Sequence, residues 1–133
     1  MGYRSDVVIA FYSTRDKQIP FAKLWLKENL PQHKSLKDCF TELNAGYLFE
    51  VEGVKWYEDY EDVKQVLKFM EDFIEMFCRD DDPDAYGACE FVRVGEELED
   101  IEVTTYGHHC AYLLSVCRHI DTENLVGVLG EKS

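Results

Sequence analysis

Carboxylates are the most numerous groups in this 133-residue sequence that could do chemistry. Between residues 58 and 102 there are seventeen acidic residues against four basic ones. The aspartates of the stretch 80–84 match the D-x-D-x-D start of an EF-hand calcium loop. The match fails because Ala85 and Phe91 stand where such a loop needs glycine and glutamate, and Pro83 lies inside it. The sequence therefore does not predict a calcium site.

Histidine and cysteine form one further group of metal-binding residue types near the C-terminus, namely His108, His109, Cys110, Cys117 and His119. Structural zinc sites combine two close pairs of ligands at recognised spacings, and only one such pair is present here. We therefore expect a core cysteine beside exposed histidines, and no metal. The five cysteines of the chain are scattered and form no C-x-x-C pair, which is typical of reduced thiols.

The sequence carries no recognisable pattern of a catalytic nucleophile. It has no G-x-S-x-G elbow, and its glycines do not form a loop that could hold a phosphate group. Adjacent acids such as Glu96 and Glu97 lie in a polar stretch, where water would surround them. We therefore predict that the protein is not an enzyme and binds no cofactor.

The acidic residues instead predict a binding surface. The net charge of −13 disfavours direct contact with nucleic acid, but spaced carboxylates attract a basic protein surface and can imitate a line of phosphates. The alternative is that the acids serve only to keep the protein soluble. The predicted binding residues are Asp80, Asp81, Asp82, Asp84, Glu96, Glu97, Glu99, Asp100, Glu71 and Glu75.

Aromatic and basic residues suggest a second kind of site, for a small ligand such as a nucleotide. Aromatic rings can stack on a base while a cation holds its phosphate. The candidates are Lys55, Trp56, Tyr57, Tyr60 and Arg93. The simpler interpretation is that Trp56 and Tyr60 attach a helix to a sheet. A third hypothesis is a homodimer formed through a free strand edge.

A long amphipathic helix is the best-specified element that could position these residues. Its apolar side chains recur at steps of three and four, which places them on one face. The predicted stripe consists of Val63, Val66, Leu67, Met70, Ile74 and Phe77. Asp59 is the predicted N-cap, and the helix should end near Arg79. The opposite, charged face includes Glu71 and Glu75.

The remaining elements follow from apolar runs and turn residues. We expect strands at 6–12, 47–54, 88–94 and 101–106, and helices at 19–30 and 35–43. In the first helix, Phe21, Leu24 and Trp25 should face the core. Residues 111–120 favour a fifth strand, with helix as the alternative, and the tail 121–133 should fray.

These elements predict one compact domain over residues 1–133. Its expected class is α+β, with two layers: a mostly antiparallel sheet of about five strands and two to three helices on one face. The chain shows no signal peptide and no apolar run that could cross a membrane, so we expect a cytoplasmic protein that does not bind membranes.

Three segments give the sequence a resemblance to known proteins. They are MGYRSDVVIA at the start, VKWYEDYEDV before the long helix, and FVRVGEELEDIE after it. Together they resemble a set of small uncharacterised proteins of bacteriophages and prophages. The resemblance implies a phage-related origin and a host-cytoplasm setting, and it implies no reaction. With the acidic residues, it suggests a counter-defence inhibitor that docks on a basic, nucleic-acid-handling host protein.

Overall fold

The computed structural model describes residues 3–97, 99–116 and 120–121. The elements follow one another in the order β1 (Ser5–Ser13), α1 (Ile19–Asn29), the 3-10 helix η1 (Lys34–Leu36), β2 (Phe40–Glu42), β3 (Gly46–Val54), α2 (Glu61–Phe77), β4 (Gly87–Val94), β5 (Ile101–Tyr106), β6 (Ser115–Val116) and β7 (Ile120–Asp121).

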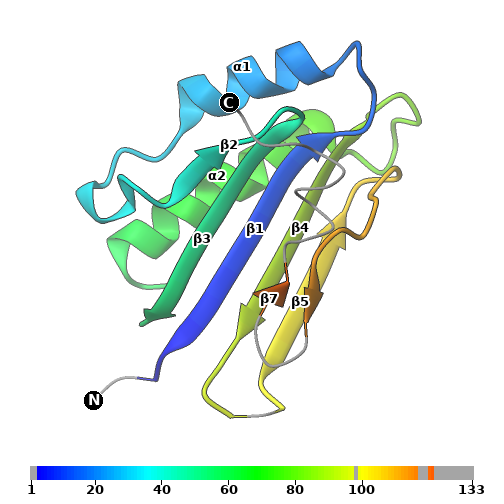
Figure 1. The fold of residues 1–133 in the computed structure, drawn as a ribbon. Coiled ribbons are helices and arrows are strands. Elements are labelled where there is room, and N and C mark those ends of the chain that lie inside the picture. The colour runs from blue at the N-terminus through cyan, green and yellow to red at the C-terminus, as the bar shows by residue number, and fades with distance from the viewer. Residues whose placement is uncertain (1–2, 98, 117–119, 122–133) are drawn as a thin grey trace.

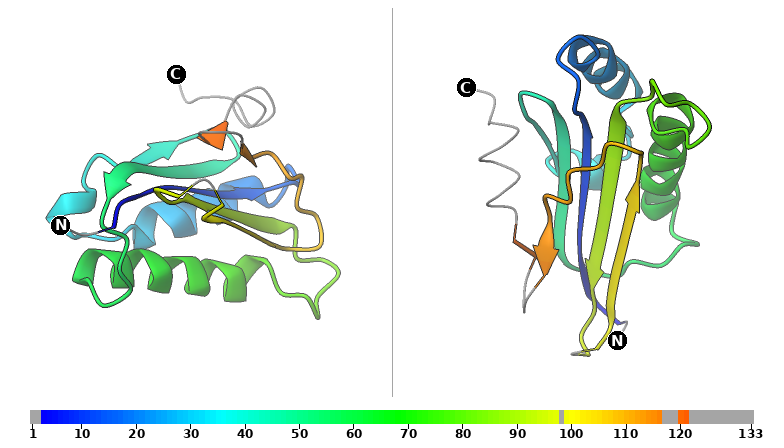
Figure 2. Two further views of the ribbon diagram at one scale, coloured as in Figure 1. Left: turned by 90° about the horizontal axis from the view of Figure 1, so that it is seen from below. Right: turned by 90° about the vertical axis from the view of Figure 1, so that its right-hand side faces the viewer.

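Five strands form one antiparallel sheet in the order β2-β3-β1-β4-β5. Helices α1 and α2 lie on one face of this sheet (Figure 1). The segment that follows β5 returns across the other face and carries the small β6–β7 pair (Figure 2). The predicted α+β class, with an antiparallel sheet and helices on one face, is confirmed.

β1 is the central strand because its apolar residues can be buried on both faces. Ile9 and Phe11 belong to the core beneath the helices, whereas Ala10 and Tyr12 belong to a second apolar cluster on the opposite face. Full burial of a large apolar side chain such as Ile9 or Phe11 contributes about 1.5–3 kcal/mol to the free energy of folding. The continuous apolar run in the sequence therefore becomes the strand on which both layers pack.

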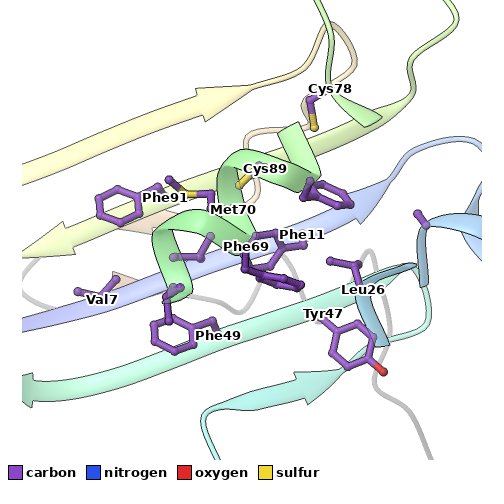
Figure 3. Close-up of a cluster of buried hydrophobic side chains, with 14 of the residues drawn as sticks. Val7, Phe11, Leu26, Tyr47, Phe49, Phe69, Met70, Cys78, Cys89 and Phe91 are labelled. Carbon is purple, nitrogen blue, oxygen red and sulfur yellow. The ribbon is translucent and has the colours of Figure 1, made fainter. Parts of the chain in front are cut away.

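Helix α2 packs on the sheet through Phe69 and Phe73. Their ring centroids lie 5.0 and 5.5 Å from the ring of Phe11, and Figure 3 shows Phe69 beside Phe11. Val63, Val66 and Met70 of the predicted stripe are buried, but Leu67 and Ile74 are only half-buried, so the prediction was rotated in part. The reason is that α2 packs against α1 as well as against the sheet. Its buried face is therefore centred on Phe69 and Phe73, which contact both Trp25 of α1 and Phe11 of β1.

The predicted inner face of α1 was also partly wrong. Trp25 packs against the core as expected, but Phe21 and Leu24 are 69% and 56% exposed. The buried positions are Ala22 and Leu26 instead, one turn apart. The small Ala22 lets the helix approach the sheet closely, and this contact turns the larger residues outward.

The helix predicted at 35–43 does not form. Only η1 is helical there, and Phe40 then pairs with Phe49 as β2 joins the edge of β3. Pairing with a ready strand edge outweighs the helical spacing of a short segment, because isolated helices of this length are marginal. β2 therefore supplies the fifth strand of the sheet.

Two further expectations were wrong in detail. Helix α2 begins at Glu61 with Tyr60 at the N-cap, so Asp59 does not cap it. Residues 111–114 form neither strand nor helix. Among the described residues of the predicted 111–120 element, strands include only Ser115 and Val116 in β6 and Ile120 in β7, which pairs with β6. Residues 117–119, and the predicted frayed tail beyond residue 121, lie outside the described residues.

Candidate functional site

The predicted acidic surface is divided between the two ends of β4. The aspartate-rich loop 80–84 precedes this strand, and the β4–β5 turn with residues 95–100 follows it (Figure 1). Eight residues of strand at about 3.3 Å each separate the two groups by about 25 Å. Glu71 and Glu75 lie exposed on α2, as predicted. The ten carboxylates therefore form separate groups on the surface.

Some of these carboxylates hold local structure together. Asp100 accepts hydrogen bonds from the Arg93 guanidinium at 2.7 Å and from the Tyr3 hydroxyl at 2.6 Å. Asp81 forms a 2.7 Å ion pair with Arg79. The hydrogen bond from Arg93 lowers the pKa of Asp100, and the hydrogen bond from Arg79 lowers that of Asp81. These two acids are committed to the loops in which they lie.

Others are available for a partner. Within the described part of the chain, no ion pair reaches Glu71, Glu75, Asp82, Glu97 or Glu99. Basic side chains act on three of them only from a longer distance: Lys68 on Glu71 and Glu75, and Arg79 on Glu75 and Asp82. These side chains are therefore among those that could meet a basic surface.

A hollow between α1 and α2, here called the helical groove, brings two of them, Glu75 and Asp82, together with apolar side chains. Its volume is about 510 Å³, and its lining consists of Trp25, Asp72, Glu75, Met76, Arg79 and Asp82. Met76 is 58% exposed, and the exposed Phe21 and Leu24 lie on α1 within one turn of Trp25. The groove thus has an apolar centre and a mainly acidic rim.

The floor of the groove is held rigidly by aromatic contacts. The Trp25 ring stacks on Phe69 at a centroid distance of 5.7 Å and meets the edge of Phe77 at 5.9 Å. Each such aromatic pair contributes about 0.5–1.5 kcal/mol beyond burial alone. The two helices therefore present the groove as a preformed surface.

A second hollow, here called the α2–β5 cavity, contains part of the predicted ligand site. It measures about 470 Å³, and Trp56 and Arg93 both line it. Lys55 and Tyr60 are not among its lining residues, and the Tyr57 hydroxyl instead accepts a hydrogen bond from the Tyr3 amide at 2.6 Å. The structure therefore brings together two of the five residues proposed for this site.

The charges of the α2–β5 cavity do not suit a nucleotide. The Arg93 guanidinium already donates to Asp100, Glu102 and Ser5. Glu58 and Glu71 add two further carboxylates to the lining. Burial raises the pKa of the Tyr106 hydroxyl, and the charges of nearby groups that include Glu102 and Glu71 raise it further. An anion would meet net negative charge here, whereas a cation would be attracted.

A buried carboxylate on the opposite face was missed by sequence reasoning. Glu90 is only 2% exposed and accepts hydrogen bonds from the Tyr12 hydroxyl and from the amides of Leu113 and Leu114, the last two at 2.9 and 3.0 Å. Tyr112, at φ 52°, turns these amides toward it. An acid within the apolar run ACEFV was the available signal, because charge is buried only where it is satisfied.

The histidines and cysteines have structural contacts. His109 stacks on Tyr86 at 4.0 Å, and a ring nitrogen of His108 lies against the carbonyl of Asp80. Burial raises the pKa of the Cys78 thiol to about 12, which makes it a poor nucleophile. Among the described residues, no group of three or more His, Cys, Asp or Glu side chains could hold a metal ion. Cys117 and His119 lie outside this part of the chain.

Comparisons with known proteins add no relative. No protein-family model, no curated protein and no solved structure matches the chain. The resemblance to phage and prophage proteins therefore remains a hypothesis. None of the helices that the structure describes has both the length and the hydrophobicity required to cross a membrane.

Proposed function

We propose that this protein is an acidic binding protein that docks on a basic protein surface through the helical groove. One observation carries the proposal: the exposed apolar side chain of Met76 lines a hollow together with Trp25 and a mainly acidic rim. Phe21, Leu24 and Met76 are each more than half exposed, while Glu75 and Asp82 line the hollow beside Met76.

This arrangement has the anatomy of a protein interface. Such interfaces combine a desolvated apolar centre with a polar rim, and large exposed hydrophobic side chains gathered in one place mark interaction sites. The rim selects for lysine and arginine on the partner, and the net charge of −13 speeds the approach of a basic protein. The apolar centre then supplies affinity that charge alone does not provide.

The partner class in this proposal is a nucleic-acid-handling protein of a bacterial host. Proteins of this class carry basic surfaces, and the phage resemblance supplies the setting. Docking of an acidic protein on such a surface would exclude nucleic acid by occupying its binding region. The acids of the β4–β5 turn, about 25 Å from the loop 80–84, contribute to the long-range field rather than to the contact.

The proposal can be tested by mapping the contact with a photo-crosslinking residue. The residue is placed at position 24 on α1 or, as a control, at position 97 in the β4–β5 turn; both positions are exposed. Crosslinking in a host lysate at position 24 should give one predominant basic protein, and competing DNA should reduce its yield. Equal yields at positions 24 and 97, or a product that DNA does not compete, would reject the helical groove as the docking surface.

A further inference from the structure

Strand β5 leaves one long edge of the sheet open. It is the last strand in the sheet order, and no described strand pairs with its outer side. The opposite edge strand, β2, has only three residues, whereas β5 has six. Figure 2 shows β5 at the margin of the sheet, next to α2. An open edge of this length can accept a further strand.

The backbone groups on this edge can be assigned from the pairing with β4. The Gly95 amide donates to the Asp100 carbonyl at 2.8 Å, and the register then runs without a break from Ile101 to Tyr106. Because antiparallel pairs alternate between hydrogen-bonded and open positions, every second residue of β5 directs its amide and carbonyl outward. These residues are Ile101, Val103 and Thr105, and of their amides that of Ile101 already donates to the Glu99 carbonyl at 3.0 Å.

The two faces beside this edge differ in chemistry. On the helix side, Glu102, Thr104 and Tyr106 line the α2–β5 cavity together with Glu71 of α2. On the other side, alternate β5 residues present apolar surface, and Val103 is 57% exposed. A strand added here would therefore place every second side chain at an acidic cavity and the others beside apolar groups.

We infer that the β5 edge binds an extended segment of a partner protein in which basic residues alternate with apolar residues. The backbone of the segment pairs with the outward groups of β5, as in other cases of strand addition. Its lysine or arginine side chains enter the α2–β5 cavity, where Glu58, Glu71 and Glu102 receive the charge and Trp56 covers the aliphatic stem. This site is separate from the helical groove and does not rest on it.

A second copy of this chain does not fit the edge. Pairing of β5 with its own copy would bring two sets of Glu58, Glu71 and Glu102 together, between molecules that each carry a net charge of −13. Like charges placed opposite each other on paired strands are destabilising. The same charges also repel nucleic acid, so a basic peptide segment is the occupant that complements the site.

The test uses a seven-residue peptide in which four lysines alternate with three valines. A control peptide has the same composition with the lysines in one block and the valines in another. Titration followed by amide NMR should show binding of the alternating peptide, with new protection at the Val103 amide. The blocked peptide cannot place lysines on one face and valines on the other while it pairs with β5. It should therefore bind at least about tenfold more weakly, which corresponds to the loss of one well-placed hydrogen bond.

Two changes separate strand pairing from general charge attraction. Val103→Pro removes an outward amide, which an edge strand tolerates, and should weaken binding about tenfold or more. Methylation of the peptide amides that face β5 should have the same effect in the unaltered protein, whereas methylation of the other amides should not. Glu28→Gln, an exposed change on α1 outside both hollows, should leave peptide binding unchanged.

The inference is overturned by any of three results. The first is equal binding of the alternating and blocked peptides. The second is binding that ignores both Val103→Pro and the position of methylation. The third is a concentration-dependent dimer that Val103→Pro abolishes, because the occupant of β5 would then be a second copy of this chain. None of these results would affect the helical groove, so the two proposals fail independently.

Discussion

Replacing Glu90 by glutamine should release the segment 110–116 from the sheet. In the wild type, one carboxylate oxygen accepts from Tyr12 and from the Leu113 amide, and the other accepts from the Leu114 amide. Glutamine offers a single acceptor oxygen. In either orientation of the glutamine side chain, its NH₂ group takes the place of one carboxylate oxygen. At least one backbone amide, that of Leu113 or Leu114, then loses its acceptor.

The expected cost follows from this geometry. A hydrogen bond to a charged group contributes about 1.5–3 kcal/mol, and a buried donor left without a partner adds a penalty of similar size. We therefore expect Glu90→Gln to cost about 2–4 kcal/mol. The loss should be concentrated in the segment 110–116, because Leu113 and Leu114 are tied to the sheet through Glu90 while the helices lie on the opposite face.

Hydrogen exchange at the amides of Leu113 and Leu114 is the direct assay. Protection there should fall by about 30-fold or more, the equivalent of 2 kcal/mol or above. Glu75→Gln, an exposed change of the same type, is the matched control and should alter stability by less than about 0.5 kcal/mol. If Glu90→Gln leaves exchange at both amides unchanged, the carboxylate does not hold this segment and the reasoning is wrong.

Two further predictions concern the packing of α2 and the effect of pH. Phe73→Ala should destabilise the protein by about 3–5 kcal/mol in urea unfolding. Leu67→Ala should cost only about 1–2 kcal/mol because its side chain is half-buried. A larger loss for Leu67→Ala than for Phe73→Ala would contradict the observed rotation of the helix. Because Arg93 lowers the pKa of Asp100, this carboxylate adds stability above its unfolded-state pKa, and that stability is lost as pH falls through the lower folded-state pKa. The stability difference between wild type and Asp100→Asn should therefore be constant from neutral pH to about pH 5 and should shrink below about pH 4. A difference that persists unchanged to pH 2 would show that the two side chains are not coupled through charge.

The sheet and the long helix were predictable because their signals are local. The run DVVIAFY has the composition of a strand buried on both faces, and the spacing of apolar residues in 61–77 requires a helix. The orientation of the helices was harder to predict. Phe21 and Leu24 have the right spacing for a core face, yet the fit of Ala22 against the sheet turns them outward. That choice depends on tertiary contacts, which periodicity does not encode.

The candidate sites show the same division between composition and arrangement. Composition correctly indicated that the acidic residues lie on the surface. It did not indicate that β4 would separate the residues of loop 80–84 from those of the β4–β5 turn. Trp56 and Arg93 line the same cavity, and the role of Arg93 in holding a phosphate stays a prediction. Arg93 also forms ion pairs with Asp100 and Glu102. These pairs form across a turn and a strand register, so they appear only once the fold is known.

The most direct test of docking through the helical groove is the affinity for the crosslinked partner, measured at low and high salt with two matched variants. Glu75→Gln with Asp82→Asn removes two charges from the groove, and Glu97→Gln with Glu99→Gln removes two from the β4–β5 turn. At about 0.5–1 kcal/mol per rim charge, the first pair should weaken binding about 5- to 30-fold at low salt. The second pair should change it by less than about twofold, and high salt should reduce the difference. Equal losses for the two pairs, or an affinity that ignores salt, would contradict docking through this groove.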